Sequence, residues 1–109
     1  MNQIPKKIVD NYINAIAKKI DVSGVLLFGS RVYGRPRKDS DVDLVVISSS
    51  FKRKNFDQRI DWLTKERLGI ADTIAMDVFG YTPQEFATIE DESAIMAKAK
   101  KDGVWLYKK

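Results

Sequence analysis

Two short apolar runs near the middle of the chain place the strongest constraint on its fold. Residues 25–28, VLLF, are continuously apolar and stop at Gly29, and residues 42–47 are rich in Val, Leu and Ile. A continuous apolar run bounded by turn residues is typical of a strand that is covered on both faces. The first run therefore predicts a strand away from the edge of a sheet, and the second predicts another strand with strong β propensity.

Further strands and several helices are expected around these runs. Apolar side chains at helical spacing, together with glycine stops at Gly69 and Gly103, predict the helices. A threonine, a proline and a glutamate within residues 82–85 form an N-cap, a first helical position and a capping box. The expected helices cover residues 5–20, 55–68, a short stretch from Pro83, and 93–102; the further strands cover 72–81 and 104–107, the latter as a strand or a docked tail.

The composition limits the size of the core and the chemistry that is available. With 109 residues and 44% apolar side chains the chain has material for a single modest core, so we expect one domain over residues 1–109. It has no cysteine and no histidine, which excludes disulfides, thiolate zinc sites and histidine bases. No apolar segment approaches the roughly 20 residues that cross a bilayer, and we expect a cytoplasmic protein without a membrane partner. Any catalysis must use carboxylates, amines, hydroxyls and hard cations.

The sequence Asp41-Val42-Asp43 is the first candidate for a metal site. Side chains two positions apart in a strand point to the same face, so the two carboxylates project side by side. At an effective dielectric of ~20, carboxylates ~5–7 Å apart repel each other by roughly 2–3 kcal/mol. A divalent cation would remove that penalty, and hard oxygen ligands favour Mg²⁺, with Mn²⁺ as the alternative. The competing interpretation is a turn at the strand entry, with Asp43 solvated at an exposed edge.

Two neighbouring features favour the metal site over the turn. The first apolar run ends in Gly29-Ser30 and is followed by a basic loop, so backbone amides and a hydroxyl can gather around a phosphate. The second feature is Asp77, a charge inside an apolar segment that would be costly to bury without a partner. An ion pair with a lysine or arginine, or an edge position, would also explain Asp77. With Asp41 and Asp43 already in place, we favour a shared metal site.

Together these residues resemble the signature of a known superfamily. Gly29-Ser30, ten intervening residues and then Asp41-Val42-Asp43 are similar to the motif of the polymerase-β-type nucleotidyltransferases, and in particular of the minimal nucleotidyltransferases. Asp77 and the later segment 81–86, YTPQEF, resemble the third carboxylate of that family and the sequence that follows it. The C-terminal segment is similar as well, so the resemblance covers nearly the whole chain.

The resemblance implies a fold and a set of site residues. The implied fold is α+β, a polymerase-β-like mixed β-sheet with helices packed on one side. Asp41, Asp43 and Asp77 are expected to be catalytic and to hold Mg²⁺, and Asp77 could also take a proton from the acceptor hydroxyl. The expected substrate is ATP or another nucleoside triphosphate. Its phosphates are expected to contact Gly29, Ser30, Arg31 and Arg35.

One position departs from the family pattern. Family members usually have a basic residue four positions after the glycine, where this chain has Tyr33. The main cation for the triphosphate is therefore open between Arg31, Arg35 and Arg37. Each of these could equally be a solvated loop charge.

The acceptor is implied by the resemblance alone. Short members of the family pair with an all-helical HEPN protein as the antitoxin of a toxin–antitoxin system, and some place AMP on a tyrosine of that partner. We therefore expect AMP transfer from ATP to a tyrosine of a HEPN partner. The alternative is a non-catalytic subunit that binds nucleotide and metal and neutralises a partner by contact alone. Nucleic-acid binding is not favoured, because the basic loops contain few aromatic residues to stack bases, and homo-oligomerisation stays open.

Overall fold

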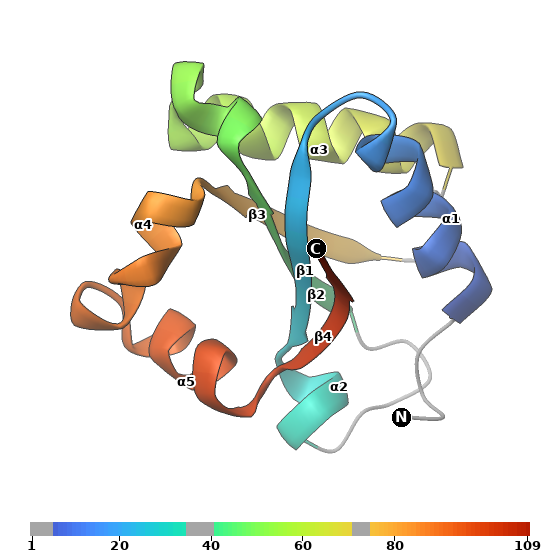
Figure 1. The fold of residues 1–109 in the computed structure, drawn as a ribbon. Coiled ribbons are helices and arrows are strands. Elements are labelled where there is room, and N and C mark those ends of the chain that lie inside the picture. Colours follow the sequence, from blue (N-terminus) through green and yellow to red (C-terminus); the bar gives the residue numbers. More distant parts are fainter. Residues whose placement is uncertain (1–5, 35–40, 71–74) are drawn as a thin grey trace.

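The computed structural model describes residues 6–34, 41–70 and 75–109, which form a sheet and the helices around it (Figure 1). The elements, in chain order, are α1 (Lys6–Ala17), β1 (Val22–Phe28), α2 (Ser30–Tyr33), β2 (Val42–Ser48), η1 (Ser49–Arg53), α3 (Phe56–Ile70), β3 (Met76–Tyr81), α4 (Pro83–Ala87), η2 (Ile89–Asp91), α5 (Ala94–Asp102) and β4 (Val104–Lys108), where η marks a 3₁₀ helix.

The sheet is mixed, and its strand order is β3-β2-β1-β4. Strand β1 is antiparallel to β2 and to β4, whereas β2 and β3 are parallel. The apolar run in β1 therefore lies at the centre, and Val25, Leu26 and Leu27 are completely buried. The predicted central strand and the α+β class are both confirmed.

Helices cover both faces of the sheet, as Figure 1 shows. Alternate strand residues enter two separate apolar clusters, so that Leu27 packs on the side of α1 and α3 while its neighbour Leu26 packs on the side of α4 and α5. The first cluster is the larger and includes the buried Tyr12 of α1 and Leu63 of α3. The helical layer expected from the resemblance thus has a smaller counterpart on the opposite face, formed by α4, η2 and α5.

Several element boundaries differ from the expected ones. Helix α1 ends at Ala17, earlier than expected, and α3 continues through Gly69 to Ile70. The one-turn helix α2 lies where a loop was expected, because four residues are too few to show helical periodicity. The first part of the strand expected over 72–81 lies outside the described residues. As expected, no helix in the described ranges is long and apolar enough to span a membrane.

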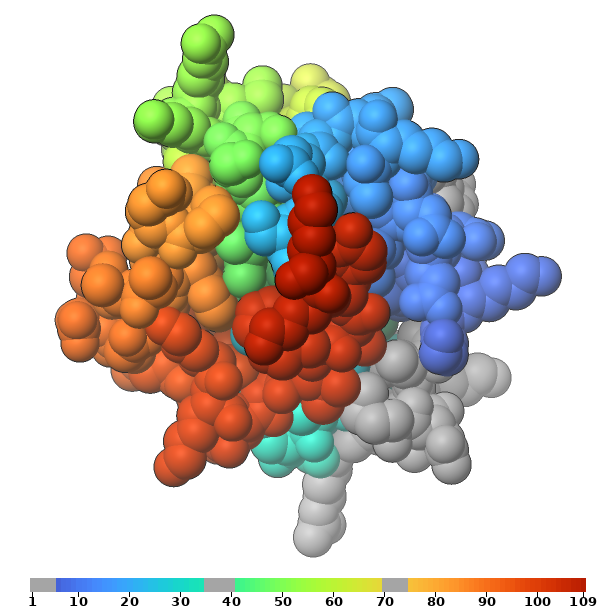
Figure 2. All heavy atoms as spheres, viewed as in Figure 1, coloured from blue at the N-terminus to red at the C-terminus, as the bar shows by residue number. Residues whose placement is uncertain are grey.

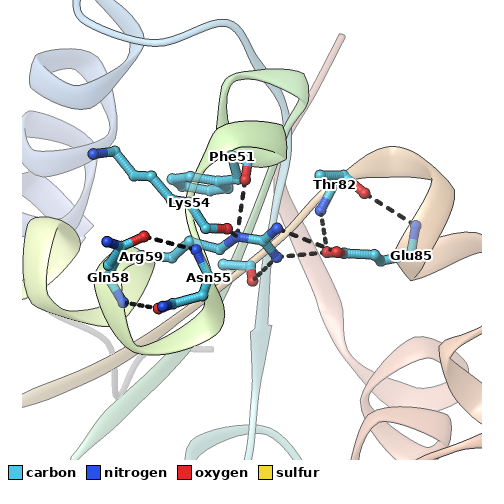
Figure 3. A network of polar contacts seen from close by, with 8 residues as sticks. Phe51, Lys54, Asn55, Gln58, Arg59, Thr82 and Glu85 are labelled. Carbon is cyan, nitrogen blue, oxygen red and sulfur yellow. Dashed lines mark hydrogen bonds and ion pairs between the residues drawn. The ribbon is translucent and has the colours of Figure 1, made fainter.

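A buried arginine joins α3 to the end of β3 (Figure 3). Arg59 is only 6% exposed, and its Nε donates to the carbonyl oxygens of Phe51 at 3.1 Å and Lys54 at 2.8 Å. Its Nη1 also donates to the carbonyl oxygen of Gly80 at 3.3 Å. These bonds satisfy carbonyl groups that would otherwise be costly to bury.

The same guanidinium meets the capping box of α4. Its Nη1 and Nη2 donate to the two carboxylate oxygens of Glu85, at 2.6 Å and 3.1 Å. Glu85 also accepts from the Thr82 amide at 2.9 Å, and the Thr82 hydroxyl accepts from the Glu85 amide at 3.1 Å. The predicted capping box is confirmed, and Arg59 anchors it to α3.

Candidate active site

Two of the predicted carboxylates face each other on neighbouring strands. Asp43 in β2 is paired in register with Asp77 in β3 and, on its other side, with Phe28 at the end of β1. Asp41 is the residue immediately before β2. Because side chains alternate along a strand, Asp43 projects to the same face as Val45, which is the face covered by α5. The three acids therefore gather at one end of the parallel pair of strands.

The electrostatics of this group are unfavourable in the isolated protein. Asp43 is half-buried, whereas Asp41 and Asp77 are exposed. Burial, and then the charges of Asp77 and Asp41, raise the pKa of the Asp43 carboxyl to about 6. Among the described residues, no ion pair includes any of these three acids. Asp43 thus carries a charge that nothing on the described surface compensates.

The donor set fits a hard divalent cation in its chemistry. Carboxylate oxygens are the ligands that Mg²⁺ prefers, and Mg²⁺ commonly takes only one or two carboxylates, completing its shell with water and phosphate oxygens. Within the described part of the chain, three acidic side chains do not come close enough together to form a complete protein cage for a metal ion. The metal role of Asp41, Asp43 and Asp77 stays a prediction, and it requires ligands from a bound phosphate.

Gly29 is required by the position of Asp43. Its backbone has φ 84° and ψ −158°, a region that is essentially restricted to glycine. A Cβ atom at this position would overlap Oδ2 of Asp43 and would lie 3.0 Å from Asp43 Cγ. The glycine therefore lets a carboxylate lie directly against the end of β1. The group that lies against the Gly29 backbone in this structure is the Asp43 carboxylate, and the predicted phosphate contact of Gly29 is a separate matter.

The short helix α2 begins beside this contact. The amides of Val32 and Tyr33 donate to the carbonyl oxygen of Gly29, at 3.0 Å and 3.2 Å. The Gly34 amide donates to the carbonyl oxygen of Ser30 at 3.0 Å, and a Cβ at Gly34 would meet Ser30 Cα at 2.9 Å. The two glycines thus bracket one tight turn that leaves the Ser30 side chain exposed near Asp43.

The structure describes only one of the two arginines predicted to bind phosphate. Arg31 is only 8% exposed, so it is no solvated loop charge and is engaged within the fold. Arg35 lies outside the described residues, as do Arg37 and Ser40. The predicted phosphate contacts of Gly29, Ser30, Arg31 and Arg35 stay predictions.

Two cavities adjoin at Asp43, and both also border Phe28 and Ile95. The first has a volume of about 430 Å³ and is additionally lined by Gly29, Tyr33 and Lys98. The second, of about 300 Å³, is lined mainly by apolar and aromatic side chains, including Phe56, Phe79 and Tyr81.

Sequence reasoning did not predict that residues of α5, or the aromatic side chains of the second cavity, line the site. Residues 93–102 show only a helical composition, which carries no functional signal. In the structure α5 lies beside α2 (Figures 1 and 2), and Nζ of Lys98 lies 4.5 Å from the centre of the Tyr33 ring. A basic residue on α5 is therefore part of the cavity that borders Asp43.

Comparisons with known proteins identify the family and the fold of the chain. A family model described as polymerase beta, nucleotidyltransferase, matches residues 10–109. A crystal structure from Sulfolobus solfataricus, of a protein described as a candidate nucleotidyltransferase, is similar with a TM-score of 0.68 and 21% sequence identity, covering 95% of this chain and 80% of that one. At this identity the structural likeness shows the fold alone. No curated protein matches the chain.

Proposed function

Because the chain belongs to the polymerase β nucleotidyltransferase family, we propose that it moves AMP from ATP to a hydroxyl acceptor, with Mg²⁺ held by Asp41, Asp43 and Asp77. One observation carries the proposal. Asp43 is half-buried without a compensating charge among the described residues, opposite Asp77 and against a glycine that leaves room for its carboxylate. A fold tolerates such an arrangement when a ligand supplies the missing positive charge.

The roles of the residues follow from their positions. A bound Mg²⁺, or Mn²⁺ in its place, would neutralise charge on the triphosphate and lower the pKa of the acceptor hydroxyl. Asp43, at the boundary of the two cavities, would help to hold that cation, and Ser30 at the start of α2 would bind phosphate oxygens. Asp77 is exposed and can take the proton of the acceptor hydroxyl while the oxygen of that hydroxyl bonds to the α-phosphorus. The bond to the β-phosphate breaks, and pyrophosphate leaves.

For the acceptor we propose a tyrosine on a separate helical protein of the HEPN class, which this chain would neutralise as an antitoxin. The motif likeness to minimal nucleotidyltransferases supports this proposal. In this proposal the separate partner presents the acceptor hydroxyl.

Mass spectrometry of the partner tests the transfer. Wild-type protein is incubated with ATP, Mg²⁺ and a cognate HEPN protein, and the partner is expected to gain the mass of AMP on a tyrosine. Asp43→Asn, which keeps the shape of the side chain and removes its charge, is expected to abolish the gain. A partner that stays unmodified with the wild-type protein, while a metal-dependent nucleotide complex forms, would exclude this acceptor and leave nucleotide binding in place.

A second candidate function is neutralisation of a partner by contact, without transfer. Tyr33 favours it, because a neutral ring stands where a phosphate-binding charge is usual in the family. In this case Asp43→Asn and Asp77→Asn would both keep full neutralising activity. Loss of neutralisation in either variant, with the complex still forming, would rule it out.

A further inference from the structure

The cavity bordered by Asp43 contains a lysine that comes from the far end of the chain. Lys98 lies on α5, and its Nζ sits above the ring of Tyr33 on α2, 4.5 Å from the ring centre. Both residues line the cavity of about 430 Å³ that also borders Gly29 and Asp43. Figure 2 shows the surfaces of α2 and α5 meeting, so the cavity is formed where two sequence-distant helices come together.

Two neighbours hold the ammonium group in place. Lys98 Nζ donates to Oδ2 of Asp102 at 2.9 Å, one helical turn further along α5. On its other side it lies over the electron-rich face of Tyr33, a cation–π contact. The Lys98 side chain is still 54% exposed, so the ammonium group can take a further anionic partner.

The charges that border the cavity are arranged for a ligand with two parts. Asp43 brings a carboxylate to the lining of this cavity, and Lys98 brings an ammonium group to the same lining. A metal-bound phosphate that continues into an anionic tail would satisfy both groups at once. Of the α2 residues, the neutral Tyr33 lines this cavity, while Arg31 is buried in the fold.

We propose that Lys98 binds the β- and γ-phosphates of the nucleotide, and that Tyr33 acts as a positioning residue that keeps Lys98 over the cavity. This assignment rests on the proposed nucleotidyltransferase function. The binding of triphosphates, more than that of monophosphates, then depends on Lys98.

Calorimetric titration separates these contributions. A non-hydrolysable ATP analogue and AMP are titrated, each with Mg²⁺, into wild-type protein, Lys98→Met and Lys98→Arg. Lys98→Met is expected to weaken binding of the ATP analogue about 10- to 100-fold and that of AMP less than about twofold, since only the former has the tail that a charged hydrogen bond would hold. Lys98→Arg is expected to keep most of the affinity.

Matched variants exclude an indirect effect of the substitution. Lys101→Met removes the same charge from an exposed position on α5 and is expected to bind the ATP analogue like wild type. Tyr33→Phe is expected to keep wild-type affinity and Tyr33→Leu to lose about three- to tenfold, because only the phenylalanine keeps the ring under the ammonium group.

The outcomes distinguish the two proposals. If wild type binds the ATP analogue in a Mg²⁺-dependent way and Lys98→Met binds it equally well, the role of Lys98 is excluded and the proposed function stands. Equal losses of ATP analogue and AMP binding in Lys98→Met also exclude it. If the wild-type protein shows no Mg²⁺-dependent binding, or Asp43→Asn does not change it, both proposals fail.

Discussion

The two ends of β3 carry acidic groups in opposite situations. Beyond its C-terminal end, Glu85 receives two hydrogen bonds from Arg59 and one from the Thr82 amide, and these contacts hold the pKa of its carboxyl below the usual range. Near its N-terminal end, Asp77 lies opposite Asp43, whose pKa is raised to about 6 by burial and by neighbouring negative charge.

Glu85 therefore stabilises the fold, whereas the charge of Asp43 is only tolerated by it. The chain has 19 lysine and arginine residues, so cations for a second network were available in its composition. In the described ranges, none of them forms an ion pair with Asp41, Asp43 or Asp77. This difference indicates that the uncompensated negative charge of Asp43 is suited to binding a ligand cation. The following substitutions test that interpretation, from the largest expected effect to the smallest.

Replacing Arg59 with methionine is expected to lower the free energy of unfolding by about 3 kcal/mol, because buried carbonyl groups lose their charged donor. The substitution leaves the carbonyl groups of Phe51, Lys54 and Gly80 without this donor, and Glu85 without its cation. Urea unfolding measures the change. A loss below about 1 kcal/mol would mean that the Arg59 network contributes little and would remove one side of the comparison.

Replacing Gly29 with alanine is expected to cost about 2 kcal/mol of stability, because its φ of 84° belongs to a region that side chains avoid. The new methyl group would also displace the Asp43 carboxylate, so metal-dependent nucleotide binding should weaken. Gly69→Ala is the control, since a Cβ there meets nothing within 4 Å, and it should stabilise α3 by up to about 1 kcal/mol. Unchanged nucleotide binding by Gly29→Ala would show that the close contact is dispensable.

Glu85→Gln is expected to cost about 1 kcal/mol at pH 7, a small value because the Glu85 side chain is 44% exposed and solvent screens its ion pair. Since folding lowers the pKa of Glu85, its stabilising contribution is complete above the unfolded-state value near 4.5 and is lost as the pH falls through the folded-state value. Unfolding midpoints of wild type and variant should therefore converge below about pH 4.5. A difference that persists in acid would assign the effect to packing.

Asp43→Asn is expected to have the opposite sign and to stabilise the protein, by ~0.5 kcal/mol at pH 8 without metal because solvent screens the half-buried charge. Folding raises the pKa of Asp43 from 3.8 to about 6, so the wild type loses stability as the pH rises through this interval. The variant should lack that loss and should match the wild type near pH 4. Thermal melts in EDTA measure the difference.

Adding Mg²⁺ and ATP analogue should then reverse the order, because the ligand stabilises only the protein that binds it. If Asp43→Asn were less stable than wild type at pH 8 in EDTA, Asp43 would resemble Glu85. The distinction between the two ends of β3 would then be lost.

Much of the fold was predictable from the sequence because its signals are local. The capping box needs only the side chains of Thr82 and Glu85 and the amides between them, and the structure contains it as expected. The central position of β1 follows from its continuous apolar run. Local signals were weaker at element ends, where α3 passes Gly69 and the single turn of α2 has no period to detect.

The candidate site was only partly predictable for the same reason. Residues two apart in a strand must share a face, so the association of Asp41 with Asp43 could be read from their spacing. Asp77 was assigned to the same group as a charge inside an apolar segment and as the third carboxylate of the resemblance. The parallel pairing of β2 with β3, which brings it opposite Asp43, could not be read from either signal.

The sequence alone determined which residues could carry chemistry. Because the chain has no cysteine and no histidine, carboxylates are the remaining candidates for metal ligands, and Gly29 before Ser30 marks the turn beside them. The tertiary structure decided which of them meet. It buries Arg31, joins Arg59 to Glu85 and brings Lys98 over Tyr33. Contacts such as the last one depend on how helices pack across a sheet, and that packing is set by the whole core, so no local pattern around either residue encodes it.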